Sequence, residues 1–157
     1  MFAWEVKALS KIFTDIEWIE EVINAAPICR LGMVDGDEPY VIPVNFGYER
    51  GFLYFHSSLK GRKVKVLENN NKICFEFETE IDIVNAKNPC ESVVKGKSVI
   101  GLGIANFLED DKDKIHALNV LMKHYTGRCN YEFSESALAS VLLIRIDITS
   151  VTGKQME

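Results

Sequence analysis

The chain has 157 residues, a length typical of one domain, and folding at this size buries roughly 68–70% of the surface that the unfolded chain exposes. Its composition, 47% hydrophobic and 26% charged with only 10 Gly and 4 Pro, excludes a mainly disordered, collagenous or coiled-coil protein. Eighteen Lys and Arg against 23 Asp and Glu leave a net charge of -5, which disfavours non-specific binding to nucleic acid phosphates.

The chain also lacks the sequence signals of a membrane or secreted protein. No stretch approaches the roughly 18 uncharged apolar residues of a membrane span. The segment Met1–Ser10 mixes Glu5 and Lys7 into its apolar residues, unlike a secretion signal. The four cysteines form no CxxC pair and suit reduced thiols. These features predict a cytoplasmic protein that binds neither membrane nor nucleic acid.

The first third of the chain predicts a helix followed by paired strands. Thr14 and Glu17 form a capping-box pattern, and apolar residues recur at helical spacing until Pro27, which predicts a helix over 14–26. Short apolar runs separated by Gly-containing turns follow. They predict strands over 28–34, 40–48 and 52–56, joined by turns at 35–37 and 49–51.

The rest of the chain alternates helical and extended patterns. The predicted helices cover 60–68 and 110–125, and the predicted strands cover 73–79, 92–107 and 141–148. The strand over 92–107 contains glycines that favour a bend, as in a barrel. Because the strands mostly follow one another through hairpin-length links, the pattern favours a mainly β (α+β) antiparallel barrel with peripheral helices. We expect residues 1–157 to form a single domain.

One segment concentrates positive charge in an otherwise acidic chain. Residues 60–65 contain four cations and no acid: Lys60, Arg62, Lys63 and Lys65. The strand before them delivers hydroxyls at 57 and 58, and the following helix directs its free N–H groups and positive dipole end to the same place. Gly61 lets a ligand approach the backbone, Arg62 can clamp a phosphate through two hydrogen bonds, and Lys63 can act as a point charge. The alternative is a solvated helix face with a serine as N-cap.

Other motifs do not support a second site. Gly96-Lys97-Ser98 resembles the end of a phosphate-binding P-loop, but a strand is predicted where a helix is required. Gly101 and Gly103 suit a bulge or a close strand contact better than a dinucleotide fingerprint. The histidines at 116 and 124 lack the spacing of a zinc site and are predicted to lie on the surface, so no metal is predicted.

Three blocks of residues, taken in order, resemble the FMN-binding split-barrel superfamily. These blocks are Arg30-Leu31-Gly32-Met33, Pro39 to Tyr48, and Gly51 to Ser57 followed by Gly61-Arg62-Lys63. Within the superfamily, the chain is most similar to pyridoxamine 5′-phosphate oxidase-like proteins of the nitroimidazole-resistance type. The resemblance runs from about Asp15 to Thr152-Gly153-Lys154.

The resemblance implies a six-stranded split barrel that forms a homodimer with two FMN molecules at the subunit interface. Related proteins place the strand equivalent to 40–46 along the flavin ring and the segment equivalent to 56–63 around the phosphate. The implied ring contacts are Pro43, Val44, Asn45, Phe46 and the ring-edge residue Ser92. The implied phosphate contacts are His56, Ser57, Gly61, Arg62 and Lys63.

The implied activity is electron transfer through FMN from a reduced nicotinamide, NAD(P)H, to a small oxidised compound such as a nitroaromatic. His56 is the candidate for proton donation or for stabilising a reduced flavin, because histidine ordinarily titrates near neutral pH. Two alternatives stay open. One is a flavin or haem binding module without turnover, and the other is pyridoxamine-phosphate oxidation, which the C-terminal Thr152-Gly153-Lys154 disfavours because it lacks the Trp- and Arg-bearing tail of those oxidases. An interaction domain with no cofactor is a third possibility.

Overall fold

The structure is a computed structural model that describes residues 10–156. The prediction for the segment Met1–Ser10 therefore falls outside the described residues, except for Ser10 itself. Its strands are β1 (Ser10–Phe13), β2 (Cys29–Asp35), β3 (Glu38–Val44), β4 (Gly47–Glu49), β5 (Phe52–Ser57), β6 (Lys72–Val84), β7 (Val93–Leu108) and β8 (Leu142–Met156). Its helices are α1 (Ile16–Ala25), α2 (Arg62–Asn69), α3 (Asp111–Thr126), α4 (Glu135–Ala139) and the short 3₁₀ helix η1 (Pro89–Glu91).

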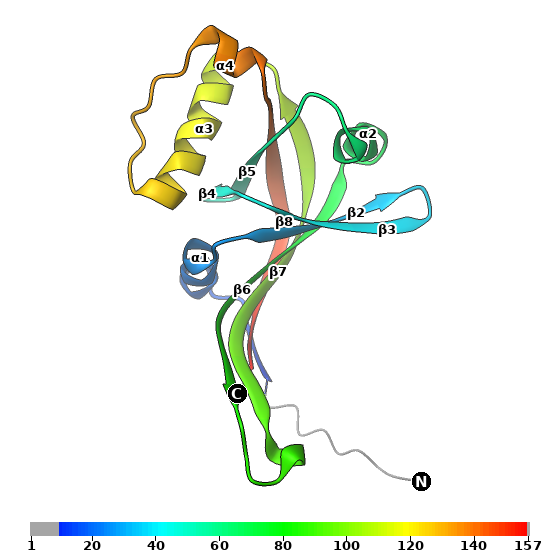
Figure 1. Cartoon of the computed structure of the whole chain (residues 1–157), viewed down its shortest axis with the longest axis vertical. Helices are drawn as coiled ribbons and strands as arrows, with labels where there is room; N and C mark the ends of the chain where they lie inside the picture. Colours follow the sequence, from blue (N-terminus) through cyan, green and yellow to red (C-terminus); the bar gives the residue numbers. More distant parts are fainter. Residues whose placement is uncertain (1–9, 157) are drawn as a thin grey trace.

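The strands form one antiparallel sheet with helices around it, which confirms the predicted mainly β architecture (Figure 1). The strand order is β3-β2-β6-β7-β8-β5-β4, and β1 pairs with β8 beside this path. All six predicted strands are present. The sheet formed by residues 10–156 has eight strands because the predicted run 40–48 is divided into β3 and β4, and because β1 is added.

The division between β3 and β4 is the opening of the split barrel. These two strands are the opposite edges of the sheet, yet only Asn45 and Phe46 separate them along the chain. The chain therefore passes directly from one edge to the other, and no ladder of backbone hydrogen bonds joins β3 to β4 within the described sheet.

Helix α3 covers this opening. A Cβ atom added to Gly47 would lie 2.6 Å from the backbone nitrogen of Leu121, so β4 packs directly against the helix backbone. The Tyr125 hydroxyl donates a hydrogen bond to the Pro27 carbonyl (2.9 Å) and accepts one from the Phe46 amide (3.1 Å). One side chain of α3 thereby satisfies two backbone groups near the opening, one before β2 and one in the link between β3 and β4.

Helix α1 lies against the main core. Its N-cap is Asp15, whose carboxylate accepts from the Glu17 amide at 3.4 Å, so the predicted capping box at Thr14 was wrong by one residue. Asp and Thr are both suitable caps, and local sequence alone does not decide between neighbours. The buried side of the helix carries Ile19, Val22 and Ile23, as its spacing predicts.

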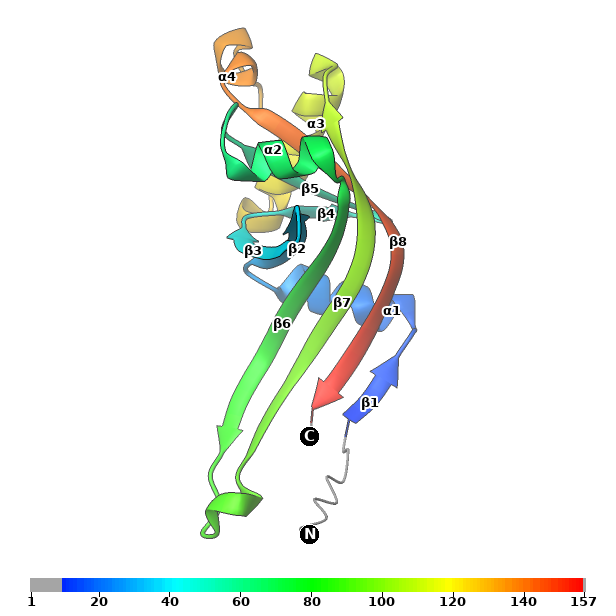
Figure 2. The same ribbon diagram turned by 90° about the vertical axis from the view of Figure 1, so that its right-hand side faces the viewer.

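Strands β6 and β7 form a long hairpin that projects beyond the rest of the sheet, with η1 at its far end (Figure 2). The glycines of β7 serve close packing, as predicted. A Cβ at Gly101 would collide with the Phe75 ring, and one at Gly103 with Ile146. The register of β7 against β8 shifts between Leu102 and Gly103, which places the predicted irregularity there.

Within residues 10–156, no helix is long and apolar enough to cross a membrane.

Candidate functional site

A pocket with a volume of ≈ 380 Å³ lies between β3, the end of β5 and the start of α2. Five of its lining residues are predicted phosphate contacts: His56, Ser57, Gly61, Arg62 and Lys63. The others are Tyr40, Ile42, Ser58, Lys60 and Val64. The fold thus brings all five predicted phosphate contacts to one pocket.

The end of β5 orients the first two of these residues. Because successive strand side chains point to opposite faces, His56 is exposed whereas Ser57 is buried, with 4% of its surface exposed. The hydroxyl of Ser58 turns back to donate to the Lys60 carbonyl at 2.7 Å. The chain therefore leaves the strand in a tight loop that leads straight into α2.

Helix α2 begins without a side-chain cap. Gly61 occupies the N-cap position with φ +144°, a backbone conformation that side chains other than glycine rarely adopt. No side chain accepts hydrogen bonds from the first N–H groups of the helix. These donors and the positive end of the helix dipole suit an anion in the pocket. The serine N-cap of the alternative prediction was wrong, whereas Lys60, Arg62 and Lys65 are exposed, as its solvated helix face expects.

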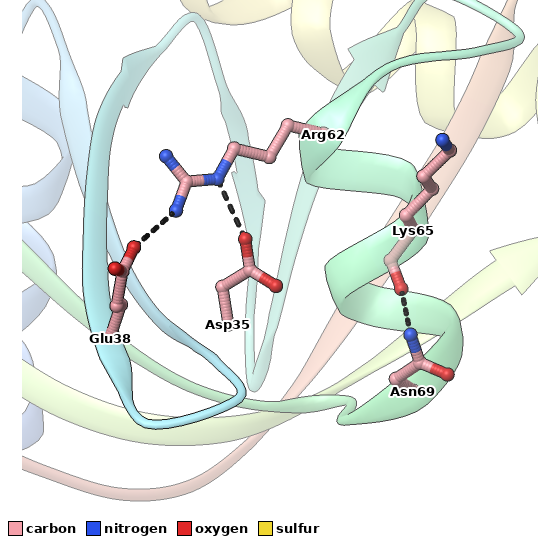
Figure 3. A network of polar contacts seen from close by, with 5 residues as sticks. All are labelled: Asp35, Glu38, Arg62, Lys65 and Asn69. Carbon is pink, nitrogen blue, oxygen red and sulfur yellow. Dashed lines mark hydrogen bonds and ion pairs between the residues drawn. The ribbon is translucent and has the colours of Figure 1, made fainter.

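Arg62 spans the gap between α2 and the β2–β3 hairpin (Figure 3). Its Nε donates to Asp35 Oδ2 at 2.7 Å and its Nη2 to Glu38 Oε2 at 3.3 Å, while the guanidinium lies 4.5 Å from the centre of the Tyr40 ring. The hydrogen bond to Asp35 raises the pKa of Arg62. A guanidinium has five N–H donors, so about three remain for a ligand.

Lys63 is the second cation of the pocket. It is half-buried, and its Nζ lies 5.4 Å from the centre of the Phe55 ring. Burial lowers its pKa because the charged form loses hydration. An anionic ligand would restore stabilisation to the ammonium group, so the position suits phosphate binding.

Lys65, the fourth cation of the predicted cluster, does not line this pocket. It lines a neighbouring cavity of ≈ 640 Å³ together with Asp35, Leu59 and Glu68. Lys60, Gly61, Arg62 and Val64 line both cavities. Of the four predicted cations, Lys63 therefore lines only the first cavity and Lys65 only the second, while the other two border both.

The predicted ring contacts 43–46 alternate between the core and the surface. Val44 and Phe46 are buried, at 7% and 1% exposed, whereas Pro43 and Asn45 are exposed. The amide of Phe46 is already bonded to Tyr125. Side-chain contact with a ligand is therefore open to Pro43 and Asn45, and not to the two core residues.

Ser92 lies directly after η1, at the far end of the β6–β7 hairpin from α2 (Figure 2). Its hydroxyl accepts a hydrogen bond from the Ala86 amide at 3.1 Å. A single chain does not bring Ser92 to the pocket, so its contact with the flavin ring stays a prediction that needs a second copy.

The remaining histidines and cysteines form no further centre. His116 is exposed, and its Nε2 lies 2.6 Å from Glu49 Oε2. His124 is partly buried, and its ring is hydrogen-bonded to the Ala26 carbonyl. The predicted surface position is therefore confirmed for His116 and wrong for His124. Burial raises the pKa of the Cys29 thiol. Across residues 10–156, no three His, Cys, Asp or Glu side chains gather in a way that could hold a metal ion.

Sequence reasoning missed several residues of the site. Tyr40 and Ile42 lie two apart on β3, so strand alternation could have placed them on one face. Asp35 and Glu38 gave no local signal, since their contact with Arg62 arises only when the hairpin meets α2.

Comparisons with known proteins agree with this architecture. The family model described as pyridoxamine 5′-phosphate oxidase matches residues 15–155. No curated protein matches the sequence. A proposed 5-nitroimidazole antibiotic resistance protein from Bacteroides thetaiotaomicron is 33% identical, with a TM-score of 0.84 over 94% of this chain and 87% of that chain.

Two more distant structures share the fold. An FAD and heme binding protein from Mycobacterium smegmatis is 20% identical, with a TM-score of 0.84 over 94% of this chain and 74% of that chain. A flavocytochrome from Azotobacter vinelandii is 22% identical, with a TM-score of 0.78 over 92% of this chain and 68% of that chain. The match over residues 15–155 and the 33% identical structure establish that the chain belongs to the pyridoxamine 5′-phosphate oxidase-like family.

Proposed function

We propose that the protein binds FMN, with the phosphate in the pocket at the start of α2. The observation that carries this proposal is the uncapped helix N-terminus beside Arg62 and Lys63 in one pocket. Free N–H groups, a guanidinium and a half-buried ammonium are the donors that a phosphate monoester requires. Ser57 adds a hydroxyl to the same lining. The residues present therefore fit the phosphate of FMN.

The flavin ring is proposed to lie along the end of β3 and the link from β3 to β4. Pro43 and Asn45 are exposed there, and Tyr40 and Ile42 continue the pocket lining along β3. An extended backbone with alternate outward side chains suits a flat aromatic ligand, since it offers both apolar contact and peptide groups at its edge.

A homodimer is part of the proposal. The projecting end of the β6–β7 hairpin exposes four large apolar residues, which cost free energy in water unless another surface covers them. These are Ile81 (49% exposed), Ile83 (65%), Val84 (38%) and Val94 (49%). A second copy seated on the hairpin would cover them and would bring Ser92 near the partner's flavin ring.

The proposed reaction moves electrons from a reduced nicotinamide to a small oxidised compound such as a nitroaromatic. Bound FMN would accept a hydride or electrons and pass them on. The chain's own residues hold the phosphate and orient the ring, and exposed His56 at the pocket edge can donate a proton to the acceptor. The nitroimidazole-resistance relative supports this substrate class. The four free thiols suit a cytoplasmic location.

A flavin or haem binding module without turnover is the competing function, because relatives of this fold include a flavocytochrome and an FAD and heme binding protein. His56 lies among Lys60, Arg62 and Lys63, surroundings that suit phosphate better than haem iron. Pyridoxamine-phosphate oxidation is less favoured, since Gly153 and Lys154 lie within β8, paired with β1 and β7, and are held in the sheet.

The test is the visible absorption spectrum of the purified protein, followed by anaerobic addition of reduced nicotinamide. We expect the two bands of oxidised flavin, and bleaching of these bands by the nicotinamide. The variant Arg62→Ala/Lys63→Ala should purify without the bands. A colourless protein that takes up no added FMN would contradict the flavin proposal, and a coloured protein that never bleaches would favour the binding module.

The role of His56 needs a separate variant. His56→Ala should keep its FMN content, because the phosphate donors remain, and should turn over a nitroaromatic more slowly at neutral pH. Unchanged turnover with FMN content preserved would remove His56 from the mechanism.

A further inference from the structure

The two cavities beside α2 adjoin one another at Arg62. The first, between β3 and the start of the helix, and the second, along the outer side of the helix, share the lining residues Lys60, Gly61, Arg62 and Val64. Asp35 lines only the second cavity. The side chain of Arg62 reaches from α2 across to the β2–β3 hairpin at this boundary (Figure 3).

The ion pairs of Arg62 with Asp35 and Glu38, here called the Arg62 bridge, join α2 to the β2–β3 hairpin. Arg62 donates to Asp35 at 2.7 Å and to Glu38 at 3.3 Å, and its guanidinium rests on the Tyr40 ring at 4.5 Å. Asp35 and Glu38 are register partners in the hairpin, separated by the two-residue turn Gly36-Asp37. The turn therefore fixes both carboxylates against one guanidinium.

We propose that Asp35 and Glu38 make the site selective for a flavin that ends in a phosphate monoester, FMN, over the dinucleotide FAD. The inference rests on the proposed function, since it assumes that the flavin phosphate lies at the start of α2. FAD is FMN extended at that phosphate by an adenylate group. An adenylate that continued into the adjoining second cavity would open the Arg62 bridge, and one that turned toward water on the hairpin side would pass the carboxylate of Glu38.

Two physical effects oppose the dinucleotide. Opening the bridge removes two charge-assisted hydrogen bonds from Arg62 and leaves two carboxylates facing a diphosphate of the same charge. A monoester stays in the first cavity, where Arg62 keeps about three free N–H donors for it while the bridge remains closed. Discrimination therefore arises from the lost Arg62 hydrogen bonds and the charge repulsion that the longer ligand meets, and not from added contact with the shorter one.

The test is the ratio of the dissociation constants for FAD and FMN, measured by quenching of flavin fluorescence on the full-length protein. We expect the wild type to bind FMN about tenfold more tightly than FAD, and Asp35→Asn/Glu38→Gln to bring the ratio near one. Glu38→Gln alone keeps the shorter contact between Arg62 and Asp35, and should lower the ratio about threefold. Each expected ratio should approach one in high salt because the carboxylates are exposed.

The matched control is Asp37→Asn, which removes the same charge from the same hairpin at a residue that does not contact Arg62. It should keep the wild-type ratio. Equal affinity of the wild type for FAD and FMN would overturn the selectivity proposal alone, as would a ratio that neither Glu38→Gln nor the double variant changes. Binding of neither flavin would overturn the proposed function together with it.

Discussion

Helices α2 and α3 meet the same sheet in opposite ways. At α3 the polar groups find partners inside the protein: the Tyr125 hydroxyl joins the Pro27 carbonyl to the Phe46 amide, and the His124 ring bonds to Ala26. At α2 the helix begins without a side-chain cap, beside the pocket that Lys60, Arg62 and Lys63 line. The comparison separates stability from function, because groups satisfied internally hold the fold, whereas donors left open can hold a ligand.

The largest expected effect on stability lies at Phe46, on the α3 side. Its ring is 1% exposed and packs on Phe77 and His124, with ring centres 4.8 Å and 4.3 Å apart. Phe46→Ala should lower the free energy of unfolding by about 4 kcal/mol, measured by urea denaturation. The control is Asn45→Ala, at the exposed neighbouring residue, which should change the free energy of unfolding by less than about 0.5 kcal/mol. Equal effects of Phe46→Ala and Asn45→Ala on the free energy of unfolding would show that the Phe46 ring is not packed against the core and α3 as described.

The next effect is expected at Gly47, where β4 touches the backbone of α3. An added Cβ would lie 2.6 Å from the Leu121 nitrogen, and the backbone can move aside only by displacing the helix. Gly47→Ala should cost about 2 kcal/mol of unfolding free energy. Gly32→Ala is the matched strand control, because its nearest neighbours, in Cys74, would lie at 3.6 Å. A tolerated Gly47→Ala would mean that α3 does not press on β4.

A smaller effect is expected at Tyr125. Tyr125→Phe leaves the Phe46 amide and the Pro27 carbonyl without this partner and should cost about 1 kcal/mol at neutral pH. Burial raises the pKa of Tyr125, so the folded protein keeps the phenolic proton at a pH where the unfolded chain loses it. Its contribution is therefore complete at neutral pH and is lost as the pH rises above about 10.

The measurement for Tyr125 is urea unfolding at a series of alkaline pH values. Tyr125→Phe should lose stability less steeply above about pH 10 than the wild type does. Parallel curves would show that the hydroxyl does not titrate differently in the two states. Burial and a hydrogen bond to Glu20 raise the pKa of Tyr48 to about 12. Tyr48 therefore contributes to the loss of stability at alkaline pH in the wild type and in Tyr125→Phe alike.

The smallest effect on stability is expected on the α2 side. Lys63→Ala should change the unfolding free energy by about 0.5 kcal/mol, the value of a cation near an aromatic ring, while it weakens FMN binding about tenfold. Lys65→Ala, two residues further along α2 and outside the first cavity, should leave FMN binding nearly unchanged. A large loss of stability in Lys63→Ala without loss of FMN affinity would reverse the contrast between the two helices.

The sequence predicted the strands and the phosphate-binding segment because both depend on local order. The Gly36 and Gly51 turns adopt positive φ, as turns of this kind require, and residues 56–63 are contiguous, so their assembly into one pocket needs only a strand, a loop and a helix. The helix at 110–125 likewise followed from its apolar spacing.

Features that depend on contacts between distant segments escaped prediction. β1 forms only because β8 extends to Met156 and offers an edge, and the Arg62 bridge forms because α2 returns to the β2–β3 hairpin. The role of Phe46 was also obscured, since a strand pattern shows alternation but not which face is covered by α3. Ser92 illustrates the remaining limit, because its predicted contact involves a second chain.

The most direct test of the phosphate site compares FMN with riboflavin, which has the same ring and ribityl chain but no phosphate. Dissociation constants for both ligands should be measured on the wild type and on Arg62→Ala/Lys63→Ala. We expect the wild type to bind FMN about 100-fold more tightly than riboflavin, and the double variant to bind the two with similar affinity. Equal affinity of the wild type for FMN and riboflavin, or a preference for FMN that survives both substitutions, would contradict a phosphate site at the start of α2.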